Sequence, residues 1–173
     1  MRLRPEFVLE RVTDLTPEHL RLLGTRGLLL DLDNTLLPPN HEGPVPSEIR
    51  NWIEELRQAG VRVALVTNAK PRRVRRVVEE LGIPGVGPVG KPLPLGFLWG
   101  LRRLGLPREQ VLVVGDQVFT DLLGARILGL RAALVRPLAR DALPSTRWLR
   151  RLERHFLEES PRMKAWPFEG GEN

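Results

Sequence analysis

The segment Gly27-Leu28-Leu29-Leu30-Asp31-Leu32-Asp33-Asn34-Thr35 joins an unbroken apolar run to a group of polar side chains. A short apolar run without alternation is typical of a strand that is buried on both faces of a parallel sheet. The two carboxylates follow at the end of this strand, and side chains two residues apart lean to the same side of it. The stretch therefore predicts a central parallel strand with Asp31 and Asp33 at its carboxyl end.

Strand-like and helix-like segments alternate along the rest of the chain. Strands are expected at 27–33, 61–66, 86–89, 111–114 and 132–135, and helices at 17–23, 47–59, 71–81, 94–104, 121–128 and 145–158. Strands that alternate with helices over short connections imply right-handed crossovers. The pattern predicts an α/β fold with a doubly wound, Rossmann-like parallel sheet of five strands.

Length and composition indicate one globular domain. The chain has 173 residues, of which 42% are hydrophobic, and no linker marks a second domain. We expect a single domain over residues 1–160 and a tail over 161–173 that is flexible at its Gly-rich end.

Several protein classes are excluded by composition. The chain has no cysteine, so disulfides and thiolate metal sites are ruled out. Its first residues lack the apolar core of a signal peptide, and no apolar run is long enough to span a bilayer, so a cytoplasmic protein is expected. The net charge of +6 and the pI near 11.0 favour anionic partners, although a basic composition also serves solubility.

Polar residues follow each expected strand. In an open parallel sheet, ligands bind beyond the carboxyl ends of the strands, where the strand order reverses. The residues at these ends are Asp31, Asp33, Thr67, Asn68, Lys91, Asp116, Gln117 and Asp121. Carboxylates, a hydroxyl and an ammonium are therefore expected on one rim.

The carboxylates among these residues predict a metal site. Asp31, Asp33 and Asp116 place three negative charges in one pocket, and such charges repel each other unless a cation neutralises them. A hard divalent ion that prefers oxygen ligands, Mg²⁺, fits this set. Zinc does not, because no histidine or cysteine accompanies the carboxylates.

A metal held by carboxylates favours phosphoryl transfer. Such a reaction needs an in-line nucleophile and positive charge around the transferring oxygens. Asp31 is the candidate nucleophile, and Asp33 is the candidate acid and base that protonates the leaving oxygen and then activates water. Thr67, Asn68 and Lys91 are the candidate phosphate-binding residues.

Four motifs together resemble those of the haloacid dehalogenase (HAD) superfamily. They read DLDNT from Asp31, VTNA from Val66, GKP from Gly90 and GDQVFTD from Gly115. Alone, the three other motifs also fit a strand-end turn or a helix terminus, and Lys91 also fits a solvated lysine. Their order, together with the segments around them, is similar to the YqeG-like subfamily of HAD phosphatases.

The resemblance implies an aspartyl-phosphate mechanism. Asp31 would be the nucleophile, and the metal would be held by Asp31, Asp116 and the backbone carbonyl of Asp33. Asp121 would position Lys91 or a metal-bound water without touching the metal itself. Gln117 is expected in the same supporting layer as Asp121. The subfamily also looks related to mitochondrial phosphatidylglycerophosphate phosphatases.

Access to the site is expected to be open. Many relatives insert a cap domain, but the segments 35–61 and 69–91 leave room only for a loop, single helices and a short strand. The loop 36–44 is a candidate gate.

Lys70, Arg72 and Arg73 begin the helix after the second strand and are candidates for substrate recognition. The arginine-rich helix 145–158 could lie on an anionic membrane or pack on the sheet.

Three functions remain open from the sequence. The leading one is a Mg²⁺-dependent phosphatase for a phospholipid head group, namely phosphatidylglycerophosphate, with peripheral contact at the inner face of the membrane. The second is a soluble phosphatase for sugar phosphates or nucleotides. The third is a nucleic-acid- or ribosome-associated module with slow turnover, for which the sequence shows no binding motif. A receiver domain is discounted, because Asp33 argues for turnover.

Overall fold

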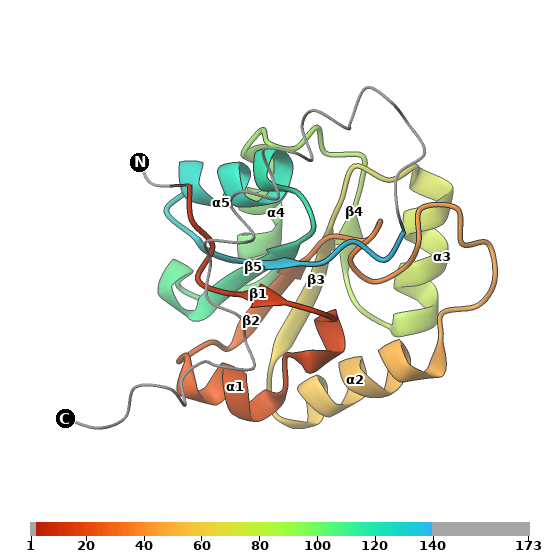
Figure 1. Cartoon of the computed structure of the whole chain (residues 1–173), viewed down its shortest axis with the longest axis horizontal. Coiled ribbons are helices and arrows are strands. Elements are labelled where there is room, and N and C mark those ends of the chain that lie inside the picture. Colours follow the sequence, from red (N-terminus) through yellow and green to blue (C-terminus); the bar gives the residue numbers. More distant parts are fainter. Residues whose placement is uncertain (1–2, 140–173) are drawn as a thin grey trace.

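The computed structural model of the chain describes residues 3–139 (Figure 1). The strands are β1 (Val8–Leu9), β2 (Gly27–Leu30), β3 (Arg62–Val66), β4 (Gly85–Val86), β5 (Val111–Gly115) and β6 (Arg131–Val135). The α-helices are α1 (Pro17–Leu22), α2 (Ser47–Gln58), α3 (Pro71–Leu81), α4 (Leu95–Leu104) and α5 (Leu123–Ile127). The expected helix 145–158, the tail 161–173 and the domain end at residue 160 lie outside the described residues.

All strands of the sheet run parallel, in the order β1-β6-β5-β2-β3-β4. The predicted α/β class and parallel sheet are confirmed, but the sheet has six strands instead of five. The additional strand is β1, whose two residues pair with Leu134 and Val135 of β6. A strand of two residues is too short to show a hydrophobic period, so the sequence pattern did not reveal it.

The helices form a layer on each side of the sheet. Leu28 and Leu30 of β2 pack in a core with α1, α2 and α3, whereas Leu29 packs in a second core with α4 and α5. Figure 1 shows α1 and α2 across the sheet from α4 and α5. Because side chains alternate along a strand, a strand in a two-sided core must be apolar on both faces. The continuous Leu28–Leu30 run meets this requirement.

The strand order reverses between β2 and β5. From β2 the chain moves outward through β3 to β4, and then returns to β5 on the other side of β2. Ligands of open parallel sheets bind at such a reversal. The topology therefore places the candidate site beyond the ends of β2 and β5.

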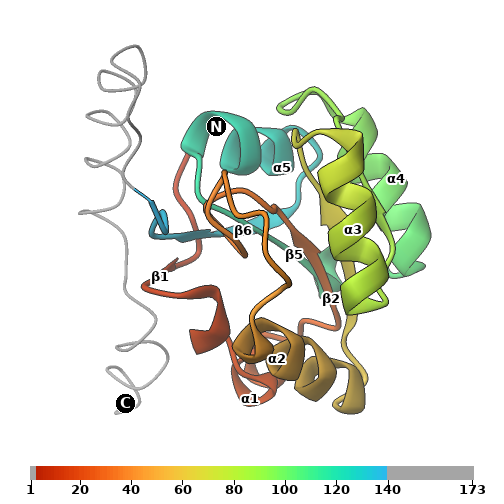
Figure 2. The ribbon, with the colours of Figure 1, turned by 90° about the vertical axis from the view of Figure 1, so that its right-hand side faces the viewer.

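The described residues 3–139 contain no cap domain. A loop joins β2 directly to α2, and only α3 lies between β3 and β4. The loop, drawn in orange in Figures 1 and 2, runs beside α3. Within the same residues, none of the helices has the length and apolar character that crossing a membrane requires.

Candidate active site

Four neighbouring strands end at one edge of the sheet and carry the predicted side chains. Asp31 follows β2, Thr67 follows β3, Lys91 lies in the loop after β4, and Asp116 follows β5. The backbone N–H of Asp31 donates to the carbonyl of Val114 at 2.9 Å, which continues the pairing of β2 with β5 past the end of the strand. Asp31 is therefore fixed by the sheet itself.

A buried charge cluster occupies this edge. Carboxylate oxygens of Asp31, Asp116 and Asp121 lie within 4.8 Å of one another, and all three residues are buried. The Nζ of Lys91 lies 2.6 Å from Oδ1 of Asp31 and 2.5 Å from Oδ1 of Asp121. Three carboxylates and one ammonium leave a net formal charge of −2 when all are ionised. Burial makes this imbalance costly.

The cluster differs in one member from the expected set of Asp31, Asp33 and Asp116. Asp121 joins Asp31 and Asp116, while the Asp33 side chain pairs with Arg73, whose Nε donates to Oδ1 at 2.8 Å. Asp121 lies in a π-helical turn, η3 (Val118–Leu122), and its Oδ2 accepts from the backbone N–H of Gln117 at 3.2 Å. The sequence predicts a regular helix over 121–128, whereas the structure has this π-helical turn followed by the shorter α5. Contact of the Asp33 backbone carbonyl with a metal stays a prediction.

The donor set of the cluster fits a divalent cation. All three groups are carboxylates, which are the ligands that hard cations such as Mg²⁺ prefer. A charge of +2 would balance the net −2 of the cluster. The described residues of the cluster include no sulfur or imidazole donor that would favour zinc.

Burial and the charge of the ion-pair partner have opposite effects on the pKa of Lys91, and likewise on that of Asp121. Burial alone would lower the pKa of Lys91, but the adjacent carboxylates of Asp121 and Asp31 outweigh it and raise this pKa above its ordinary value. Lys91 is therefore a permanent cation of the site. Burial raises the pKa of Asp121, and the Lys91 ammonium and the Gln117 N–H counteract only part of this rise. In a poorly solvated site, burial disfavours the charged form of Asp121, and nearby carboxylates favour the charged form of Lys91.

Asp33 lies beside the cluster and is more accessible than its members. Its side chain is 33% exposed, against 7% for that of Asp31. Partial burial raises the pKa of Asp33, and the Arg73 guanidinium opposes this effect. A carboxyl group with solvent access and a raised pKa can donate and accept a proton.

Thr67 and Asn68 hold the loop that carries Lys91. The backbone N–H of Thr67 donates to Val86, and its buried hydroxyl accepts from the N–H of Ala69 at 3.2 Å. The Asn68 side chain accepts from the Lys91 N–H at 2.8 Å and donates to the Lys91 carbonyl at 3.3 Å. The predicted contacts of Thr67 and Asn68 with phosphate stay predictions, and the structure adds this positioning role for Asn68.

The three basic residues proposed for substrate recognition differ in exposure. Lys70 and Arg72 are exposed at the start of α3, next to the site. Arg73 is mostly covered, because its guanidinium contacts Asp33 and the loop before α2. Lys70 and Arg72 are therefore the cations of this group that face solvent.

Asn34 fastens the loop after β2 to the chain after β6. Its φ of 63° is left-handed, a conformation that asparagine tolerates better than most residues. Its side-chain Oδ1 accepts from the N–H of Ala139 at 3.1 Å, and its carbonyl accepts from Leu138 at 3.2 Å. The sequence pattern does not reveal this role for Asn34. Its one signal is the position of an asparagine directly after the carboxylates at the strand end.

Gly115 allows Asp121 to approach the end of β5. A Cβ atom at Gly115 would lie 2.2 Å from Cγ of Asp121, far inside van der Waals contact. We expect Gly115→Ala to displace Asp121 from Lys91 and to lower the free energy of unfolding in urea by about 1–3 kcal/mol. Gly43→Ala is the control, since its Cβ would meet only His41 at an ordinary 3.5 Å. Equal stability of the two variants would contradict this packing.

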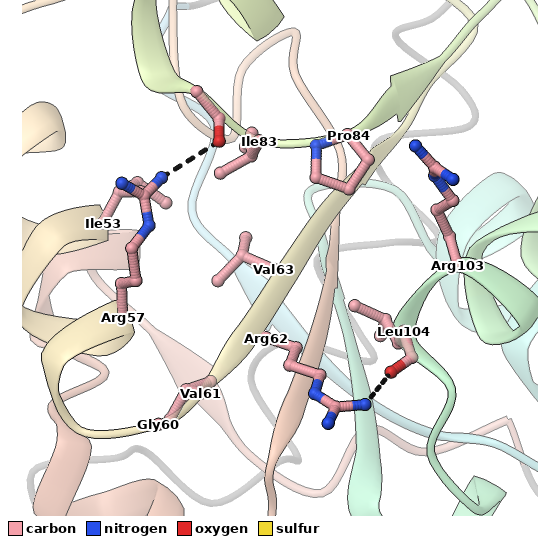
Figure 3. A pocket seen from close by; sticks show the side chains of 11 residues that line it. Ile53, Arg57, Gly60, Val61, Arg62, Val63, Ile83, Pro84, Arg103 and Leu104 are labelled. Carbon is pink, nitrogen blue, oxygen red and sulfur yellow. Dashed lines mark hydrogen bonds between the residues drawn. The ribbon is translucent and has the colours of Figure 1, made fainter.

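A separate cavity of about 440 Å³ lies at the amino end of β3, away from the cluster (Figure 3). Its floor is apolar, and three of its lining residues are arginines. Arg57 donates to the carbonyls of Leu81 and Gly82, and Arg62 donates to that of Leu104, so both satisfy carbonyls at helix ends. We assign these two arginines to the stability of the fold.

Comparisons with known proteins agree with the fold and identify the family. A family model described as a haloacid dehalogenase-like hydrolase matches residues 39–129. The chain is 35% identical over 153 residues to a "Probable phosphatase YqeG" of Bacillus subtilis, covering 88% of each protein. It is 32% identical over 117 residues to a phosphoserine phosphatase of Thermus thermophilus, spanning 60% of this chain and 47% of that enzyme, about half its length.

A solved structure shows the same fold. A crystal structure of an uncharacterized protein from Listeria monocytogenes superposes with a TM-score of 0.52 at 20% identity, covering 68% of this chain and 84% of that one. A parallel sheet whose strand order reverses beside a carboxylate cluster places the chain in the Rossmann-like α/β class. The chain belongs to the haloacid dehalogenase-like hydrolase family. The resemblance drawn from its four motifs is confirmed.

Proposed function

We propose that this chain, a phosphatase of the haloacid dehalogenase-like family, hydrolyses phosphate monoesters with Mg²⁺ through an aspartyl phosphate on Asp31. The observation that carries the proposal is the buried cluster of Asp31, Asp116 and Asp121 around Lys91. A net negative pocket needs a cation before it can receive a phosphate anion. The cluster supplies both the ligands for that cation and a carboxylate nucleophile.

The proposed reaction has two steps. A carboxylate oxygen of Asp31 forms a bond to phosphorus while the bond to the leaving oxygen breaks, and Asp33 gives that oxygen a proton. Water then attacks the phosphorus of the acyl phosphate, Asp33 takes a proton from the water, and Asp31 and inorganic phosphate are released. The ammonium of Lys91 and the hydroxyl of Thr67 stabilise charge on the transferring oxygens. When bound, Mg²⁺ supplies further positive charge there.

Metal removal tests the cofactor. After treatment with EDTA we expect phosphate release from p-nitrophenyl phosphate to fall by about 10²-fold or more, since a metal contributes several kcal/mol to stabilising the transition state. Added MgCl₂ should restore it and also raise the melting temperature, because binding to the folded state alone stabilises that state. Full activity in protein shown by elemental analysis to be metal-free would contradict the Mg²⁺ requirement.

The proposed substrate is the phosphate of an anionic phospholipid head group, phosphatidylglycerophosphate. The uncapped rim and the exposed Lys70 and Arg72 support a substrate held at a surface, as does the net charge of +6. Peripheral contact with the inner face of the membrane is part of this proposal. The alternative is a soluble ester, which is favoured by a relative named phosphoserine phosphatase and by others named phosphoglycolate phosphatase.

A substrate panel separates these functions. Vesicles containing phosphatidylglycerophosphate are compared with soluble phosphoserine, phosphoglycolate, sugar phosphates and nucleotides, with Asp31→Asn as the control. Rapid release from vesicles with slow release from soluble esters is expected. Phosphate release from the soluble esters alone would show that the substrate is a soluble metabolite and not a phospholipid. Slow release from all of them, with RNA binding that weakens steeply with salt, would favour the nucleic-acid-associated module.

A further inference from the structure

One face of α3 binds the loop that joins β2 to α2. Arg73 donates to the carbonyls of Pro38 and His41, and Arg76 donates to those of His41 and Glu42. Glu80 accepts from the backbone N–H of Val45 at 2.6 Å and lies 3.8 Å from Arg76. Residues 73, 76 and 80 are spaced so that they share one helical face. The loop proposed as a gate is therefore attached along its length to α3.

Arg73 differs from the other residues of this face, because it also contacts the site. Its Nε donates to Oδ1 of Asp33 at 2.8 Å, and its Nη2 donates to the Pro38 carbonyl at 2.6 Å. The side chain is only 15% exposed. The planar guanidinium thus joins the Asp33 carboxylate and two loop carbonyls in one rigid geometry, which a lysine could not reproduce.

We infer that Arg73 is a positioning residue, which fixes the Asp33 carboxyl group and the loop beside it where the leaving oxygen is protonated. This inference rests on the proposed function, in which Asp33 is the acid. Asp33 lies after the strand end and is held by Arg73 from an element 40 residues away. An acid must be within hydrogen-bond reach of the leaving oxygen, so a mobile carboxyl group would lose most of its effect.

The competing explanation is that Arg73 only anchors the loop. Arg76 provides the comparison, because it contacts the same loop at His41 and Glu42 and makes its ion pair with Glu80. Arg76→Ala should loosen the loop and spare the Asp33 carboxyl group. Arg73→Ala removes both contacts. A change found only in the Arg73 variant is therefore due to Asp33 or to the Pro38 carbonyl, which Arg76 does not contact. Only the loss of Asp33 should depend on the need of the leaving group for a proton.

The experiment uses two esters whose leaving groups differ in their need for a proton. p-Nitrophenolate leaves without protonation, whereas the alkoxide of glycerol phosphate needs an acid. The value of kcat/KM reports the step up to phosphoryl transfer, before water attacks. For Arg73→Ala we expect kcat/KM for glycerol phosphate to fall about 10²-fold, and that for p-nitrophenyl phosphate to fall less than about 5-fold. Arg76→Ala should keep the wild-type ratio of the two values.

The outcomes separate the inference from the function on which it rests. Equal losses with both esters, or the same change of ratio in Arg76→Ala, would overturn the positioning role while the phosphatase function stands. Wild-type protein that hydrolyses neither ester nor any member of the panel would overturn the function and the inference together. If Arg73→Ala does not fold, Arg73→Met keeps the apolar stem of the side chain, and an unchanged ratio in that variant would equally overturn the role.

Discussion

Asp31→Asn is expected to abolish turnover, with a loss in kcat of about 10⁴-fold or more, as for removal of a covalent nucleophile elsewhere. The asparagine amide has the same shape but cannot form the acyl phosphate. The fold should survive, because Lys91 keeps its ion pair with Asp121 at 2.5 Å. Phosphate release and thermal unfolding measure the two effects.

The variant also tests the covalent step directly. Wild-type enzyme that is quenched in acid during turnover should carry one phosphoryl group on the peptide containing Asp31, as seen by mass spectrometry, and Asp31→Asn should carry none. Glu79→Gln is the control for removing a carboxylate, because Glu79 is exposed on α3. Activity of Asp31→Asn within tenfold of the wild type would rule out Asp31 as the nucleophile.

Lys91→Met is expected to give the largest loss of stability in the described part of the chain. Methionine has a similar length but no charge, so Asp31, Asp116 and Asp121 would remain buried together without the ammonium. Breaking a buried ion pair from one side costs about 3–5 kcal/mol. Activity should also fall by about 10²–10³, as when a preorganised donor to the transferring oxygens is removed. Urea unfolding and phosphate release measure these effects.

Two comparisons show whether charge imbalance causes this loss. Mg²⁺ should raise the melting temperature of Lys91→Met more than that of the wild type, because the variant cluster has a greater excess of negative charge. The double variant Lys91→Met/Asp121→Asn should recover part of the lost stability, since it removes one carboxylate as well. If the double variant is less stable by the sum of the single effects, packing and not charge explains the role of Lys91.

The sequence was sufficient to predict the parts of the site that are fixed by local pattern. Asp31, Thr67, Lys91 and Asp116 each follow a strand, and the carboxyl ends of parallel strands meet at one edge. Asp31, Lys91 and Asp116 meet there in one cluster, and the proposed roles of all four residues stay predictions. The α/β class could also be predicted from local pattern, because strand-like and helix-like segments alternate along the chain.

Other parts of the structure depend on contacts between distant segments, which a single sequence does not reveal. The Arg73–Asp33 ion pair joins residues 40 apart, and Asn34 contacts Ala139 at the far end of the described chain. The place of Asp121 in the cluster depends on the π-helical turn, a local departure from regular helix. Strand β1 depends on its pairing with β6 alone.

The sheet order also determines which part of the site is lost first when the protein opens locally. Strands β2 and β5, which carry Asp31 and Asp116, are central and paired on both sides, whereas β4 has two residues and lies at the edge of the sheet. A short outermost strand such as β4 opens at a lower free energy than the central strands do. Fraying at β4 would withdraw the ammonium of Lys91 while the carboxylates stay in place. The briefly opened molecule would therefore bind a cation more tightly than the closed one.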